Sequence, residues 1–359
     1  MPKTMLVSLW LRSPFDQSRG SDTHTRLTSL GEALEETEGI RKAHHPKHGW
    51  GKPQVIFVAP EYLFGRPTGN TAPPLFSRIL SYTPHPQTTQ ERHLNETEAN
   101  KILGKLKRLS GEYPKFLMIP GTIAWYKLFK DLKVPDAAWD RVYQAARRLG
   151  NQSDDELADA LDSHFPGAPP HAAPTSDQKL DRLLSFEGLQ ARKKSTLTQA
   201  ERVRLANAKL CLNTAVVLYG GKAPFVYHKQ GDFHEVLENY DAGRATQVAI
   251  PGVKDGVFEL EGMKFGIEIC LDNAVGALRL HHGTPPPPLI HIITSASVAV
   301  NFANVVVKPG GYVMNASCNI GDSGLWYRHP GLGWQEQTPF RIIDDVAGYN
   351  LWVYEITIA

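Results

Sequence analysis

The stretch MKFGIEICLDNAVGAL, Met263–Leu278, decides how this chain is expected to fold. In its first half, apolar side chains alternate with other residues, which is the period-two pattern of a β-strand. The second half predicts a helix that starts at Asp272 or Asn273, because both residue types are favoured N-caps. Cys270 lies where the strand meets the helix. Backbone N–H groups and the helix dipole favour a thiolate at such a junction.

A buried core cysteine is the alternative interpretation of this stretch, and it is the commoner fate of cysteine in a strand. The sequence holds two further cysteines, Cys211 and Cys318, and both lie in apolar strand-like runs where a core position is expected. Three cysteines without CxxC or Cys/His spacing indicate neither a disulfide framework nor a zinc site. A reducing, cytoplasmic setting fits this pattern.

Composition and charge exclude several classes of protein. The chain has 359 residues, of which 42% are hydrophobic, so it can bury a large α/β core. Its 39 basic and 37 acidic residues nearly balance, and no Lys/Arg run is interleaved with aromatic residues, so nucleic acid is not an expected partner. No apolar run reaches the ~18 residues that a membrane span needs, and the N-terminal apolar run is too short for a signal peptide.

Strands and helices alternate along most of the sequence. Strands are predicted at 5–11, 55–59, 116–119, 211–219, 224–228, 257–261, 263–270, 289–297, 311–318 and 351–358. Long helices are predicted at about 22–44 and at 95–109, the second with Asn95 or Thr97 as N-cap. This order predicts a mostly parallel sheet with helices packed on it, and the paired strands suit an α-β-β-α sandwich.

Residues 125–207 interrupt this alternation with a stretch that is predicted to be wholly helical. Two capping boxes, Ser153-x-x-Glu156 and Thr198-x-x-Glu201, mark helix starts, and the loop Pro166–Ser176 divides the stretch into two halves. We therefore expect one domain, residues 1–359, with a helical insertion at 125–207. A lid over a pocket and a surface module without effect on chemistry are equally compatible with its sequence.

Three chemically capable side chains each follow a predicted buried strand: Glu61, Lys229 and Cys270. Strand ends are where an α/β sheet builds its site. A cysteine that attacks a carbon–nitrogen centre needs a base, which a carboxylate can supply, and positive charge or N–H groups where oxyanion charge develops. Lys229 and the backbone N–H of Leu271 would meet the second need. Taken singly, Glu61 and Lys229 also fit an exposed loop carboxylate and a solvated surface lysine.

The sequence resembles the nitrilase, or carbon–nitrogen hydrolase, superfamily. The motifs that carry the resemblance occur in the family's order, and they are APE at 59–61, NTAVV at 213–217, VYHK at 226–229 and GIEICLD at 266–272. SASV at 295–298 and YVMNASCNIG at 312–321 resemble later strand motifs of the same family. The resemblance implies a nitrilase-like α-β-β-α sandwich with a Glu-Lys-Cys triad. It assigns Glu61 as general base, Lys229 as the oxyanion-stabilising lysine and Cys270 as nucleophile.

The chain departs from the family pattern at several positions. Leu271 stands where an aromatic residue usually follows the cysteine, and His228 stands where arginine often precedes the lysine. Many members carry a second glutamate beyond the lysine, and Glu235 is the expected counterpart here, in preference to Glu238. Glu268 makes the motif similar to that of the glutaminase domains of NAD synthetases, and alternation puts it on the same strand face as the cysteine. We nevertheless expect it to be a structural, hydrogen-bonding carboxylate.

These features together predict a thiol hydrolase of amide, nitrile or carbamoyl substrates that works through a thioester and uses no metal or cofactor. Two alternatives remain open, an acyltransferase of the same fold and a scaffold that binds a partner through the insertion. A Cys–His protease that uses His228 or His234 ranks lower, since alternation points His228 away from Lys229. The resemblance implies a homodimer or larger homo-oligomer, and the apolar strand Leu351–Ile358 is expected to join the shared surface.

Overall fold

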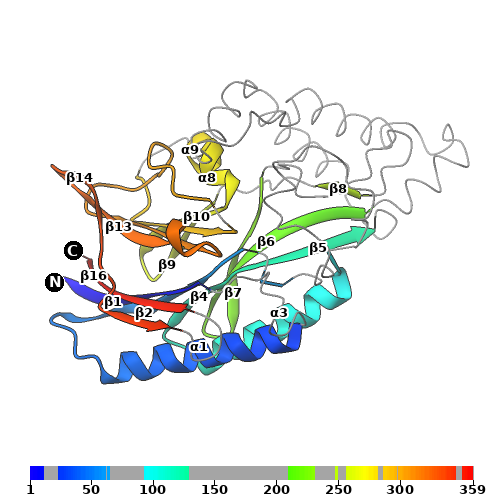
Figure 1. Cartoon of the computed structure of the whole chain (residues 1–359), viewed down its shortest axis with the longest axis horizontal. Coiled ribbons are helices and arrows are strands. Elements are labelled where there is room, and N and C mark those ends of the chain that lie inside the picture. The colour runs from blue at the N-terminus through cyan, green and yellow to red at the C-terminus, as the bar shows by residue number, and fades with distance from the viewer. Residues whose placement is uncertain are drawn as a thin grey trace, which may run out of the picture.

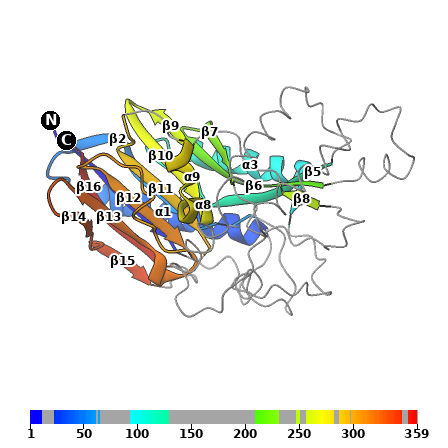
Figure 2. The ribbon, with the colours of Figure 1, turned by 90° about the horizontal axis from the view of Figure 1, so that it is seen from above.

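The structure is a computed structural model in which two β-sheets pack face to face (Figure 1; Figure 2). It describes residues 1–11, 23–61, 63–64, 93–128, 209–230, 247–249, 256–281, 286–296, 298–344 and 350–358. Among these residues, no helix is both long enough and apolar enough to cross a lipid bilayer.

The first sheet contains ten of the described strands. They are β1 (Lys3–Trp10), β2 (Gly49–Ala59), β3 (Leu94–Asn95), β4 (Phe116–Pro120), β5 (Thr122–Leu128), β6 (Lys209–Tyr219), β7 (Lys222–His228), β8 (Gln247–Ala249), β15 (Arg341–Asp344) and β16 (Asn350–Ile358). The order is β15-β16-β1-β2-β4-β6-β5-β3, with β7 and β8 also paired to β6. Strands β1, β2 and β4 are parallel, so their carboxyl ends meet at one edge.

The second sheet contains six of the described strands. They are β9 (Val257–Leu260), β10 (Met263–Ile269), β11 (Ile290–Ser295), β12 (Tyr312–Ser317), β13 (Gly324–His329) and β14 (Gly333–Glu336). They follow the order β14-β13-β12-β11-β10-β9. Strands β10, β11 and β12 are parallel, so the residues that follow them also gather at one edge.

Apolar residues fill the space between the sheets and beneath the helices. Val7, Ile56, Ile267 and Met314 belong to one buried cluster that both sheets share. Side chains on the other face of the first sheet pack against α1 (Thr23–Ala43) and α3 (Glu96–Glu112). The short helices α8 (Leu271–Val275) and α9 (Ala277–His281) lie on the outer side of the second sheet (Figure 1). The α-β-β-α sandwich expected from the sequence is therefore confirmed.

The predicted elements agree with the structure in most places. Helix α3 begins after Asn95, whose side chain accepts from the Glu98 N–H while Glu98 accepts from the Asn95 N–H, a complete capping box. The sequence did not predict β5, which overlaps the start of the expected helical insertion. It also did not predict β3, β8, β13, β14 and β15, which are strands of two to six residues. Such short strands give too few alternations for the pattern to be recognised.

One expectation about the sheet edges needs correction, and a second stays untested. Trp125–Leu128 continue β5 in register with β6, so the first four residues of the expected insertion are strand, and 129–208 lie outside the described residues. Strand β16 pairs with β1 on one side and with β15 on the other. Its apolar residues Leu351, Val353 and Ile356 are buried inside this chain, and the oligomer surface expected at this strand stays a prediction.

Candidate active site

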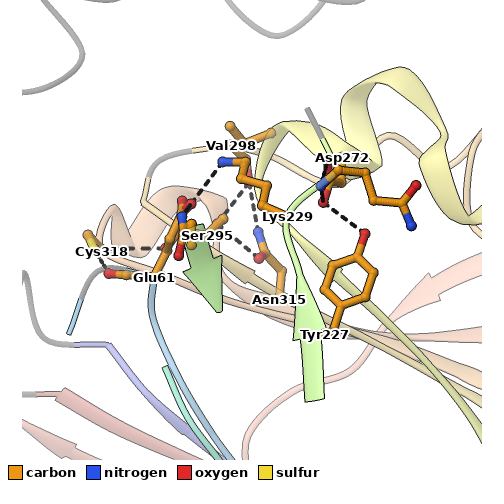
Figure 3. A network of polar contacts seen from close by, with 10 residues as sticks. Glu61, Tyr227, Lys229, Asp272, Ser295, Val298, Asn315 and Cys318 are labelled. Carbon is orange, nitrogen blue, oxygen red and sulfur yellow. Dashed lines mark hydrogen bonds and ion pairs between the residues drawn. The ribbon is translucent and has the colours of Figure 1, made fainter. Parts of the chain in front are cut away.

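Glu61 and Lys229 form a buried ion pair at the carboxyl ends of β2 and β7. Lys229 Nζ donates to Glu61 Oε1 at 2.8 Å, and the two side chains are 0% (Glu61) and 2% (Lys229) exposed. Asn213 Nδ2 on β6 donates to the same oxygen at 2.7 Å. Figure 3 shows the two side chains pointing toward each other from their separate strands. A counter-ion within hydrogen-bond distance offsets part of the desolvation cost of each buried charge.

Cys270 lies at a sharp turn that ends β10. Its backbone has φ 53° and ψ −115°, and Glu261 is the only other non-glycine residue with positive φ among those described. Residues with a Cβ rarely adopt this conformation, so the surrounding contacts must hold it. The Cys270 N–H donates to Thr294 O at 2.9 Å, and helix α8 begins directly afterwards at Leu271.

Asp272 and Asn273 are not the N-caps that the sequence predicted, because the turn takes place at Cys270 itself. Their side chains make tertiary contacts instead. Asp272 accepts from Tyr227 Oη at 2.8 Å and from the Gln230 N–H at 3.1 Å. Asn273 Nδ2 donates to Glu268 at 2.9 Å. Both side chains therefore attach α8 to neighbouring strands.

The Asp272 carboxylate links the cysteine turn to the segment that carries Lys229. Its two donors, Tyr227 and Gln230, lie on either side of Lys229 in the sequence. Figure 3 shows Tyr227 pointing toward Asp272. Burial raises the pKa of Asp272 to about 7, against the opposing effect of the nearby Lys229 charge. Burial and the neighbouring carboxylate raise the pKa of Tyr227 well above its usual value, so this hydroxyl stays a donor.

We expect Asp272 to make the free energy of unfolding fall as pH rises. A raised carboxyl pKa means that the folded state holds a proton more tightly than the unfolded state does between pH about 4 and 7. Across that window the free energy of unfolding of the wild type should fall by roughly 4 kcal/mol relative to that of Asp272→Asn. Urea unfolding of both proteins at several pH values measures the difference. The control is Asp344→Asn, a change at an exposed residue of β15. Parallel plots of unfolding free energy against pH for wild type and Asp272→Asn would contradict the prediction.

Glu268 has the structural role expected of it. Its carboxylate accepts from the Leu278 N–H at 2.6 Å and lies 3.0 Å from His291 Nε2, and both side chains are fully buried. The alternation that placed Glu268 and Cys270 on one face does not extend to Cys270, because β10 ends at Ile269 and Cys270 has positive φ. Glu268 instead secures α8 and α9 to the second sheet.

Sequence reasoning missed two residues at this edge. Cys318 follows β12 directly, with Sγ 3.9 Å from Glu61 O and 3.8 Å from Ser295 O (Figure 3). The residue is partly exposed, so it is not the core residue that the sequence predicted. Burial of Sγ, followed by the nearby Glu61 charge, raises the pKa of this thiol well above its usual value. Asn213 belongs to the NTAVV motif, but no sequence pattern predicted it as a partner of Glu61. The rule that residues after parallel strands meet at one edge would have identified Cys318.

Several predicted residues lie outside the described residues, namely Glu235, Glu238 and His234. Leu271 is buried as the first residue of α8, directly after Cys270. His228 Nδ1 lies 2.8 Å from Thr214 Oγ1, which also accepts from Trp125 Nε1 at 2.8 Å. Within the part of the chain that the structure describes, no three His, Cys, Asp or Glu side chains are grouped as metal ligands.

Comparisons with known proteins gave matches among solved structures. No protein-family model and no curated protein matches the sequence. Nit3 from Saccharomyces cerevisiae, described as a member of branch 10 of the nitrilase superfamily, is 14% identical over 98% of this chain and 90% of its own, with a TM-score of 0.44. An amidase of the nitrilase superfamily from Nesterenkonia, as a C145A mutant, is 10% identical over 98% and 90%, with a TM-score of 0.37.

A third match is the glutamine-dependent NAD+ synthetase from Acinetobacter baumannii, which is 14% identical and has a TM-score of 0.40. That alignment covers 98% of this chain but 45% of the synthetase. The solved structures to which this chain is similar thus include members of the nitrilase superfamily, the family that its sequence motifs resemble.

Proposed function

We propose that the protein hydrolyses a non-peptide carbon–nitrogen bond with Cys270 as nucleophile, Glu61 as general base and Lys229 as oxyanion-stabilising cation. The observation that carries the proposal is the buried pair of Glu61 and Lys229, joined at 2.8 Å at the edge where the Cys270 turn is anchored to β11. A buried ion pair costs desolvation free energy, and functional sites are where such pairs are maintained.

The first half of the reaction breaks the carbon–nitrogen bond. Glu61 takes the thiol proton of Cys270, and the thiolate adds to the carbonyl carbon of an amide or carbamoyl substrate. Lys229 Nζ and the Leu271 N–H stabilise the negative charge that develops on the carbonyl oxygen. Glu61 then gives its proton to the leaving nitrogen. Ammonia or an amine departs, and the acyl group remains on Cys270 as a thioester.

The second half of the reaction releases the acid. Glu61 accepts a proton from a water molecule, and the resulting hydroxide attacks the thioester carbon. The carbon–sulfur bond breaks, and the Glu61 proton returns to the Cys270 thiolate. Glu235 is proposed as the second glutamate of the site, and a homo-oligomer is proposed as the working form. A small amide or nitrile is the proposed substrate class.

Trapping the thioester tests this function even though the substrate is not identified. The protein is incubated with a pool of small amides and nitriles, and intact mass and ammonia release are followed. We expect a mass increase equal to one acyl group, located by peptide mapping on Cys270, with Cys211 and Cys318 as internal controls. Release of the acyl group only after an amine is added would indicate acyl transfer. An adduct confined to another cysteine, or ammonia release without any adduct in rapid-quench samples, would refute the proposal.

A further inference from the structure

We propose that Thr294, at the end of β11, is a positioning residue that sets the separation between Glu61 and Cys270. This inference rests on the proposed function and deepens it. Thr294 belongs to the second sheet, is fully buried, and is bonded to the segments that carry both side chains. It would act through them, without touching substrate.

The backbone of Thr294 holds the nucleophile. Its carbonyl accepts from the Cys270 N–H at 2.9 Å, one residue beyond the last paired position of β10 and β11, where Ile269 lies opposite Thr294. This bond therefore fixes the first atom of the residue whose φ is 53°. A turn in this conformation keeps its geometry only where neighbouring groups hold it.

The side chain of Thr294 holds the segment of the base. Oγ1 donates to Ala59 O at 2.8 Å, and Ala59 is the last residue of β2 in the other sheet. The next carbonyl of β11, that of Ser295, accepts from the Glu61 N–H at 3.2 Å. Two consecutive residues of β11 thus tie the end of β2 to the second sheet on both sides of Pro60.

The end of β11 is itself fixed by its neighbour β12. Ser295 Oγ donates to Asn315 Oδ1 at 3.0 Å, and Asn315 Nδ2 donates to Val298 O at 2.8 Å (Figure 3). The same amide nitrogen donates to Asp322 O at 2.7 Å. Because these polar groups are buried and bonded to one another, β11 provides a rigid reference for both reacting groups.

The consequence is a specific kinetic effect. Apolar side chains pack the sheets together elsewhere, and such contacts permit small sliding movements, whereas a hydrogen bond fixes direction and distance. A displacement of about 1 Å between reacting groups can lower a rate by roughly 10²-fold. Loss of the Thr294 hydroxyl should therefore slow proton transfer between Cys270 and Glu61 while leaving substrate affinity nearly unchanged.

The test compares Thr294→Val, which removes the hydroxyl with little change of shape, with Thr294→Ser, which keeps it. We expect kcat to fall at least tenfold in the valine variant with KM within twofold, and both constants to stay within threefold of wild type in the serine variant. Alkylation of Cys270 by iodoacetamide should be at least tenfold slower in the valine variant only. If that variant does not fold, Thr294→Ala replaces it, since its smaller side chain leaves room for a water to donate to Ala59 O.

Alkylation needs no substrate, so it separates this inference from the proposed function. Turnover that survives in Cys270→Ala would refute the proposed function. The alkylation rates of wild type and of the Thr294 variants would still report on the position of the Cys270 thiol. A merely structural Thr294 would lower the melting temperature of the valine variant and leave kcat and the alkylation rate within twofold of wild type. That result, or a serine variant as slow as the valine variant, would overturn the inference.

Discussion

Replacing Cys270 with alanine is expected to abolish turnover while the protein stays folded. The thioester cannot form without the sulfur, and loss of a catalytic nucleophile lowers kcat by about 10⁴-fold or more. Cys270 is 3% exposed as a residue and belongs to the core shared by the two sheets, so removal of its sulfur costs about 1 kcal/mol of unfolding free energy. Ammonia release and urea unfolding measure the two effects separately.

A matched cysteine variant serves as control for this experiment. Cys211 is also buried, but it lies within β6 and not after a strand end. Cys211→Ala should lose similar stability and keep its turnover per folded molecule. Residual activity of Cys270→Ala above a few per cent of wild type would refute the nucleophile assignment. Equal loss in both variants would show that the activity depends only on intact packing.

Breaking the ion pair of Glu61 and Lys229 from either side is expected to destabilise the protein strongly. Lys229→Met leaves the Glu61 carboxylate buried with Asn213 as a side-chain donor, and Glu61→Gln leaves the Lys229 ammonium buried near Asp272. Each single change should cost about 3–5 kcal/mol, because a buried charge that has lost its 2.8 Å counter-ion remains. The double variant should cost less than the sum, since neither charge is then present.

Urea unfolding of the four proteins at pH 7.5 completes this double-mutant cycle. We expect a coupling free energy of at least about 2 kcal/mol between the two positions. All three variants should lack turnover, so activity cannot substitute for the stability measurement. Additive destabilisation within about 0.5 kcal/mol would mean that the two charges do not interact as the 2.8 Å distance indicates.

Much of the candidate site can be predicted from short sequence patterns. The apolar run before Glu61 predicts a buried strand, and the alternation before Cys270 predicts another, so both residues could be placed at strand ends. The hairpin before Lys229 is predicted by its turn Gly220-Gly221, where both residues have positive φ as a tight two-residue turn requires. Local sequence is sufficient at these places because the pattern and the fold depend on the same residues.

The remaining features depend on contacts that no local pattern encodes. The positive φ of Cys270 is held by neighbouring strands, so the alternation predicts a strand one residue too long at that position. Aspartate is a residue type favoured at N-caps, yet the hydrogen-bond partners of Asp272 are 42 and 45 residues distant in the sequence. The hydroxyl of Thr294 bonds a carbonyl 235 residues earlier. Glu235 and the helical character of 129–207 stay predictions.

The position of β16 has a consequence for how the chain folds during synthesis. Residues 3–10 are translated before their antiparallel neighbour, residues 351–358, which follows more than 340 residues later. The first sheet therefore cannot close around β1 until residues 351–358 have been synthesised. Contacts so distant in sequence slow folding, and an open strand edge is exposed to wrong pairing until they form. We expect chains that stop before β16 to depend on chaperones far more than chains that include it.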